Sequence, residues 1–243
     1  MQGERIMIKK LFEKHEALVV FGSLILYLGI NFAGGGELYT TNPRGPIVNT
    51  LISILLLVLI IGGGRTAYYG LRKPQNAKQL LYFLPLALLP LTNLISGITV
   101  RSAPVIICHI LLMLNVGFCE EIIFRGFLFR YMAKDNLKSA IIVSALTFGI
   151  GHIGNLMNGA PVGSTLMQVC YAIGVGFLMV FIFIRSGSLL PCIICHQAIN
   201  STSVFGKDFD NSMLGSIFMI VVEVVYILYI LKKTDKNMLS QKS

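Results

Sequence analysis

The stretch PIVNTLISILLLVLIIGG, residues 46–63, has no charged side chain in 18 consecutive positions. A helix needs about 20 mostly apolar residues to cross the hydrocarbon core of a bilayer, so this run is a candidate membrane span. The whole chain shares its character, because 55% of the 243 residues are hydrophobic and only 13% are charged. Soluble domains carry about 25% charged residues, and half that number could not cover a water-soluble protein of this size. The sequence therefore predicts an all-α fold, a polytopic transmembrane helix bundle.

We expect about eight spans in a single integral membrane domain, residues 1–243. The candidate spans are 17–33, 46–63, 79–97, 104–130, 139–153, 163–185, 188–205 and 212–231. The third contains Pro85 and Pro90 and should be kinked or partly irregular. The fifth is short, and the seventh carries polar residues. The basic leader before the first run lacks a small-residue cleavage site, so we interpret that run as a retained span rather than a signal peptide.

The distribution of basic residues predicts how these spans are oriented. With the N-terminus inside the cell, cytoplasmic segments hold 16 Lys and Arg, whereas outer segments hold three. Such an excess marks cytoplasmic loops, so the N- and C-termini are both predicted to be cytoplasmic. The net charge of +9 is concentrated at the ends of apolar runs, where it meets anionic lipid. This pattern favours the lipid bilayer as a partner and excludes nucleic acid.

Three motifs place titratable or amide side chains inside predicted spans. They are CEEIIFR at 119–125, FGIGH at 148–152 and HQAIN at 196–200. A charged group within a bilayer costs several kcal/mol, so each is a functional candidate by default. Two other titratable residues lie in spans. We expect His109 either to support the site from behind or to be structural, and Glu223 to serve packing or an interfacial hydrogen bond.

The spacing within and between the motifs predicts which side chains meet. Glu121 and Arg125 are four residues apart, so they face each other on a helix and can form a neutralising ion pair. Glu120 points about 100° away from Glu121, and its partners must come from other helices. With a rise of 1.5 Å per residue, Glu120, His152 and His196 lie ~15, ~21 and ~12 Å above the cytoplasmic ends of their helices. These heights are similar enough for the three side chains to converge, with Asn200 one turn beyond His196.

Such a set of groups has the chemistry of peptide-bond hydrolysis. A carboxylate beside an imidazole can deprotonate a water molecule, and a neutral His and an Asn amide can donate to an oxyanion. Glu, His and His could instead hold zinc with one open position. However, the sequence has no HExxH motif, and the spacing fits no standard zinc signature. We therefore expect no metal and no other cofactor.

CIICH, residues 192–196, also has the form of a c-type haem attachment motif. Haem is attached outside the cytoplasm to an accessible segment, whereas the predicted topology puts these residues in the inner half of a span. We therefore expect no haem, and we interpret Cys192 and Cys195 as packing residues. The odd total of five cysteines likewise argues against a disulfide framework.

The three motifs together resemble those of the CAAX protease and bacteriocin-processing family, also called the Abi family of intramembrane proteases. EEIIFR resembles its Glu-Glu-x-x-x-Arg motif, FGIGH its Phe-x-x-x-His motif and HQAIN its third motif, in the family's order. The resemblance covers residues 104–205, which would form the catalytic core. It implies that Glu120 and His152 position the attacking water, that His196 and Asn200 stabilise the oxyanion, and that Glu121 and Arg125 orient the site.

The resemblance also implies an endopeptidase that uses glutamate-activated water on a membrane-associated peptide or protein. Bacterial members mature peptides, process bacteriocins or confer self-immunity to them, or regulate other membrane proteins. This compact, loop-poor chain looks bacterial, so we expect it in a bacterial plasma membrane and do not expect it to cleave prenylated peptides. The alternative is a non-catalytic scaffold that binds another membrane protein with the same fold. A proton-coupled transporter is disfavoured because no inverted repeat is evident.

Overall fold

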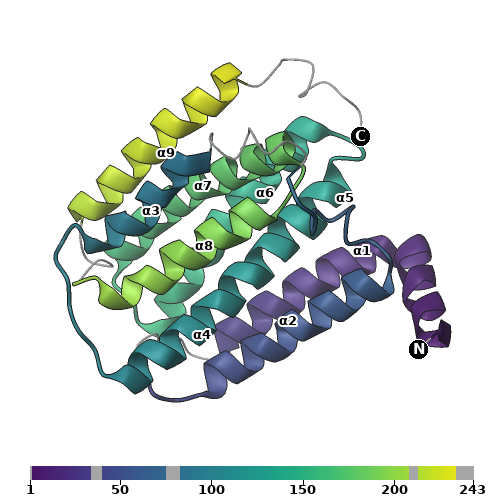
Figure 1. Ribbon diagram of the computed structural model, residues 1–243, viewed down its shortest axis with the longest axis horizontal. Helices are drawn as coiled ribbons and strands as arrows, with labels where there is room; N and C mark the ends of the chain where they lie inside the picture. Colours follow the sequence, from purple (N-terminus) through teal and green to yellow (C-terminus); the bar gives the residue numbers. More distant parts are fainter. Residues whose placement is uncertain (1, 34–39, 75–82, 208–212, 234–243) are drawn as a thin grey trace.

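The computed structural model describes residues 2–33, 40–74, 83–207 and 213–233, which form a bundle of roughly aligned helices (Figure 1). The α-helices are α1 (Gln2–Ala33), α2 (Arg44–Gly62), α3 (Leu88–Leu91), α4 (Ala103–Glu120), α5 (Arg130–Met132), α6 (Leu137–Gly151), α7 (Val162–Ser186), α8 (Leu190–Thr202) and α9 (Met213–Lys233). A π-helix, Glu121–Phe129, joins α4 to α5, and 3-10 turns follow α3, α6 and α8 at Thr92–Leu94, His152–Asn158 and Ser203–Phe205. Buried apolar side chains from α1 through α9 form one continuous core.

Six of the helical segments are long and apolar enough to cross a membrane. They are Ile6–Ala33, Arg44–Gly62, Ala103–Met132, Leu137–Asn158, Val162–Ser186 and Gly215–Lys232. The predicted polytopic helical bundle is therefore confirmed. The fifth predicted span is longer than expected, because the 3-10 turn after α6 continues its axis to Asn158.

The third and seventh predicted spans form shorter helices. The third corresponds to the apolar segment Phe83–Leu94, and residues 79–82 of that prediction lie outside the described part of the chain. Short 3-10 and α-helical pieces alternate here, as predicted from Pro85 and Pro90, because proline lacks the backbone N–H donor that helical hydrogen bonding requires. The seventh is α8, which has 13 residues before its 3-10 extension.

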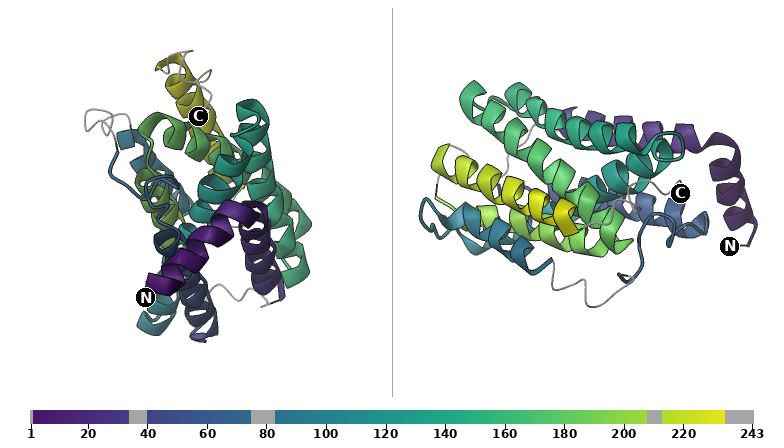
Figure 2. Two further views of the ribbon diagram at one scale, coloured as in Figure 1. Left: turned by 90° about the vertical axis from the view of Figure 1, so that its right-hand side faces the viewer. Right: turned by 90° about the horizontal axis from the view of Figure 1, so that it is seen from above.

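The first helix consists of two parts that meet at His15. This exposed residue has φ −137° and ψ 37°, which are not helical values. The basic leader before it changes direction at one end of the bundle, where Phe12 packs against Tyr69 and Phe127, whereas the apolar run after it lies alongside α2 (Figure 2). The break therefore coincides with the predicted start of the first span. Figure 1 also shows that α1 begins and α9 ends at the same end of the bundle, as an even number of crossings requires.

Small residues allow the central helices to approach closely. A Cβ added to Gly149 of α6 would lie 2.8 Å from the backbone nitrogen of Ile173 on α7. A Cβ added to Gly176 of α7 would lie 2.9 Å from Cα of Ala145 on α6. Close backbone approach of this kind is how membrane helices gain packing energy without a hydrophobic driving force. It fixes α6, and with it the FGIGH motif, against the rest of the bundle.

Candidate active site

Glu120 is the last residue of α4, and its carboxylate contacts two other helices. The hydroxyl of Tyr27 on α1 donates to Glu120 Oε1 across 3.0 Å. On α8, Nε2 of His196 lies 3.3 Å from Glu120 Oε2. Both contacts of the Glu120 carboxylate therefore come from other helices, as predicted, and one of them is the predicted His196.

Glu121 and Arg125 form a salt bridge that is completely buried. Glu121 Oε1 lies 3.0 Å from Nη1 of Arg125, and both side chains have 0% exposure. The predicted pairing is confirmed, but the backbone that carries it is a π-helix rather than the expected α-helix. Ser144 of α6 donates to the carbonyl of Phe124 within this segment across 2.8 Å. π-helical turns occur frequently at functional sites, so this irregularity is a second indication that the segment is functional.

His196 joins the two glutamates. Its Nδ1 lies 2.9 Å from Oε1 of Glu121, while its Nε2 faces Glu120. An ionised carboxylate only accepts hydrogen bonds, so Nδ1 is the donor toward Glu121. Glu121 therefore has two donors on its Oε1, the imidazole of His196 and the guanidinium of Arg125. A buried carboxylate needs such partners, because an unpaired charge in an apolar interior is strongly destabilising.

The ring of Phe148 contacts side chains from all three motifs. Its ring makes edge contacts with His152 and His196, with ring centroids 5.3 Å and 5.5 Å away. The guanidinium carbon of Arg125 lies 4.1 Å from the centroid of the same ring. Nε and Nη2 of Arg125 have no hydrogen-bond partner among the described residues, and the negative face of an aromatic ring is a favourable neighbour for such a cation.

His152 lies where α6 changes into its 3-10 turn. Its Nδ1 is 3.1 Å from the carbonyl oxygen of Phe148. Because a carbonyl can only accept, Nδ1 must carry hydrogen, which leaves Nε2 as the acceptor in the neutral ring. His152 and His196 both make edge contacts with the ring of Phe148, and His196 contacts Glu120. The structure therefore brings the second and third motifs together at Phe148.

Asn200 is half-buried near the end of α8, where two buried side chains hold the backbone. His109 Nε2 lies 3.1 Å from the carbonyl oxygen of Asn200 and donates to it. The amide of Asn93 donates to the carbonyl of Ile199 across 2.6 Å. His109 thus has the structural role that was expected of it, because it supports the helix end that carries Asn200.

Gly117 lets α4 and α8 meet beside the site. A Cβ added to it would lie 3.0 Å from Cγ of Gln197 and 3.1 Å from the backbone nitrogen of the same residue. Gln197 also donates to the carbonyl of Leu114 on α4 across 2.7 Å. The contact lies one turn before Glu120 on one helix and next to His196 on the other. It therefore sets the distance between the carboxylates and the imidazole.

We expect Gly117→Val to push α8 away and to lower the free energy of unfolding by about 1–3 kcal/mol, the usual effect of overpacking. Gly22→Val is the matched control, because a Cβ added to Gly22 meets nothing within 4 Å. Thermal unfolding can be followed with a thiol-reactive dye, since Cys119, Cys192 and Cys195 are buried free thiols. Equal unfolding midpoints for the two variants would contradict the tight contact.

Sequence reasoning missed Tyr27. Its side chain is buried, with 3% exposure, in the first apolar span, and tyrosine within such a run is easily taken for a packing residue. A usable signal was the second polar residue one turn later, Asn31, whose amide donates to the carbonyl of Tyr27 across 2.9 Å. Two polar side chains four residues apart mark one face of a helix.

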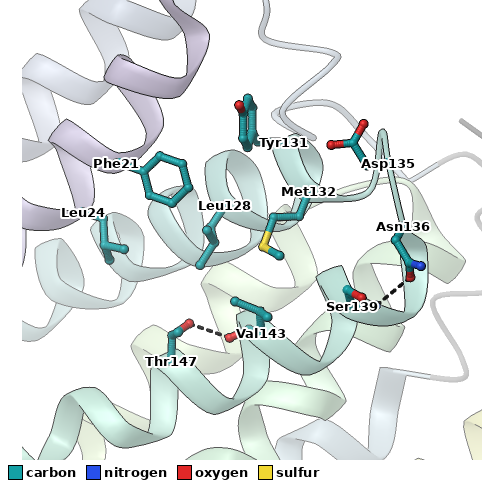
Figure 3. A pocket seen from close by; sticks show the side chains of 10 residues that line it. All are labelled: Phe21, Leu24, Leu128, Tyr131, Met132, Asp135, Asn136, Ser139, Val143 and Thr147. Carbon is teal, nitrogen blue, oxygen red and sulfur yellow. Dashed lines mark hydrogen bonds between the residues drawn. The ribbon is translucent and has the colours of Figure 1, made fainter.

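A groove of about 460 Å³ lies between α1 and α6 (Figure 3). Its walls are formed by Phe21, Leu24, Leu128, Tyr131, Met132, Asp135, Asn136, Ser139, Val143 and Thr147. Asp135, Asn136 and Ser139 lie at one end of the groove, where the α5–α6 connection closes it, whereas Thr147 lies toward the other end (Figure 3). Leu24 precedes Tyr27 by one turn in α1, and Thr147 precedes Phe148 in α6. None of the predicted site residues lines it.

The nitrogens of the two site histidines face oxygen atoms of other residues. Both ring nitrogens of His196 face carboxylates, and Nδ1 of His152 faces a carbonyl oxygen. In the described ranges no three His, Cys, Asp or Glu side chains are grouped as ligands for one ion. The thiols of Cys192 and Cys195 are buried and donate to the carbonyls of Met179 and Leu86, so both behave as the predicted packing residues.

Comparison with known proteins is consistent with this geometry. Residues 102–202 match the family model described as Type II CAAX prenyl endopeptidase Rce1-like. The match contains Glu120, Glu121, Arg125, His152, His196 and Asn200, whereas Tyr27 lies outside it. No curated protein and no solved structure matches the chain. Six membrane-length helices fit a multi-pass membrane protein, and residues 102–202 of the chain are similar to the Rce1-like CAAX endopeptidase family.

Proposed function

We propose that the protein hydrolyses a peptide bond in a membrane-associated peptide or protein, using water activated by Glu120, in a bacterial plasma membrane. One observation carries the assignment of the base. Glu120 and Glu121 contact the same imidazole, but the side chain of Glu120 is 16% exposed whereas that of Glu121 is 0% exposed. A general base must reach the water from which it takes a proton, and only Glu120 can do so.

The two histidines take different parts in this reaction. Neutral His152 accepts through Nε2 and holds the attacking water beside Glu120. The water oxygen bonds to the peptide carbonyl carbon while Glu120 takes one of its protons. The carbonyl π electrons move to oxygen, which becomes the oxyanion. Glu120 then returns the proton to the amide nitrogen as the carbon–nitrogen bond breaks, so the products are a carboxyl group and an amine.

Transfer of the proton to Glu120 makes the Nε2 hydrogen of His196 available. While Glu120 is ionised it attracts the imidazole, whose Nε2 lies 3.3 Å from Oε2, and once Glu120 is protonated this attraction falls. The same hydrogen can then be donated to the oxyanion, together with the amide of Asn200. Glu121 and Arg125 hold the imidazole from the buried side throughout, which is an orienting role.

A comparison of membrane peptides tests the proposal. We expect a specific peptide to be present in cells with the wild-type protein and absent in those with Glu120→Ala or His152→Ala, while both variants accumulate in the membrane. A scaffold protein would behave differently, because loss of these two side chains would leave its biological effect intact. If both variants keep full biological activity, the protease hypothesis is wrong and the non-catalytic scaffold is the better explanation.

Chelation tests the metal-free mechanism. The proposed roles occupy the nitrogens of His152 and His196 without a cation, so purified protein should keep its full rate after exhaustive treatment with chelators. The measurement is the cleavage rate before treatment, after it, and after zinc is added back. Loss on chelation that zinc reverses would overturn the metal-free mechanism.

A further inference from the structure

The carboxylate of Glu120 is held at both of its oxygen atoms. Oε2 faces Nε2 of His196 at 3.3 Å, and Oε1 accepts from the hydroxyl of Tyr27 at 3.0 Å. The imidazole and the hydroxyl come from α8 and α1, which are separate helices of the bundle. A carboxylate bound at one oxygen can still rotate about its terminal torsion, which is broad and roughly two-fold. A second donor at the other oxygen removes that freedom.

Tyr27 is itself fixed by a chain of polar contacts between α1 and α2. Asn31 donates to the carbonyl of Tyr27 across 2.9 Å. The amide of Asn49 on α2 lies 3.2 Å from Oδ1 of Asn31 and 3.2 Å from the carbonyl of Gly45. Hydrogen bonds between membrane helices have no competing water in the bilayer core. This chain therefore sets the depth at which α1 presents Tyr27 to Glu120.

The phenol has the right chemistry to hold a group that gains and loses a proton. A tyrosine hydroxyl has one hydrogen to donate and lone pairs with which to accept. It can donate to ionised Glu120 and, by rotating, accept from the protonated acid. A lysine or arginine at this position could only donate hydrogen bonds, and its positive charge would oppose protonation of Glu120. The buried arginine of the site is instead paired with Glu121.

We propose that Tyr27 is a positioning residue that orients the carboxylate of Glu120 for proton transfer, and that α1 is therefore part of the catalytic machinery. This inference rests on the proposed function, because it assigns Tyr27 to the same hydrolysis. Tyr27 lies outside the residues that match the family model, 102–202.

Tyr27→Phe tests the proposal, because it removes one hydroxyl and keeps the ring. We expect kcat to fall roughly 10- to 100-fold, since orientation of a general base supplies part of its 10²–10⁴-fold effect. KM should change less than about twofold, because the hydroxyl contacts no substrate. Tyr69→Phe is the matched control: Tyr69 is also buried and donates to a glutamate, Glu16, across 3.2 Å, but it lies in a different cluster. The control should keep the wild-type kcat.

Infrared spectroscopy provides a readout that does not depend on activity. The carboxylate bands of Glu120 can be assigned as those lost in Glu120→Gln. They should shift in Tyr27→Phe and stay unchanged in Tyr69→Phe, while both variants unfold at similar temperatures. Wild-type proteolysis with an unchanged kcat in Tyr27→Phe would overturn this inference alone. Absence of proteolysis by the wild-type protein would overturn the proposed function, and the positioning role with it.

Discussion

Glu120→Gln should lower kcat/KM by roughly 10²–10⁴-fold, the effect of removing a general base, while the protein stays folded. The amide of glutamine has almost the shape of the carboxylate and can still accept from Tyr27 through its oxygen. It has no basic lone pair with which to take a proton from water. The loss should therefore appear mainly in kcat. The measurement is a cleavage assay with purified protein and the peptide identified from membranes.

Glu223→Gln is the matched control for this substitution. Glu223 is another buried glutamate in a span, with 1% exposure, and packs into the notch left by Gly174 of α7. It lies in α9, apart from the three motifs, so its variant should keep activity within about twofold. A similar loss of activity in both variants would show that any change of a buried carboxylate disturbs the bundle. The general-base assignment of Glu120 would then be wrong.

Motif spacing predicted contacts correctly where they depend on the periodicity of a single helix or on depth in the membrane. Glu121 and Arg125 pair because residues four apart face each other, and this remained true although the backbone widened into a π-helix. Glu120 and His196 meet because both lie at similar depths in their helices. The catalytic roles of these residues remain predictions.

Other features could not be predicted because they depend on packing between distant segments. The π-helix has no pattern of its own in EIIFRGFLF; it coexists with a hydrogen bond from Ser144 that only the folded α6 can supply. The contact between Tyr27 and Glu120 joins residues 93 positions apart, and depth alone does not indicate which side chain of α1 faces the site. The predicted span 188–205 is longer than α8, which has 13 residues. Hydropathy measures apolar character and does not show where helical hydrogen bonding ends.

Arg125→Met should be the most destabilising of the substitutions considered. Removal of one partner from a buried ion pair typically lowers the free energy of unfolding by about 3–5 kcal/mol, because the remaining charge loses its counterion. Here the remaining charge is Glu121, which has 0% exposure and keeps only the imidazole of His196 at its Oε1, while its Oε2 has no hydrogen-bond partner among the described residues. We expect a large fall in the unfolding midpoint, measured with the thiol-reactive dye, and little protein in the membrane.

The double variant Glu121→Gln/Arg125→Met separates the cost of the unpaired charge from that of lost packing. It removes both charges and keeps side chains of similar volume, so it should recover most of the stability that Arg125→Met loses, since buried ion pairs are often no more stabilising than apolar replacements. It should not recover cleavage, because His196 then lacks the carboxylate that holds Nδ1 at 2.9 Å. Full activity in the double variant would mean that the pair serves insertion and folding alone. Inactive but stable protein would instead mean that Glu121 and Arg125 orient the imidazole that receives the oxyanion.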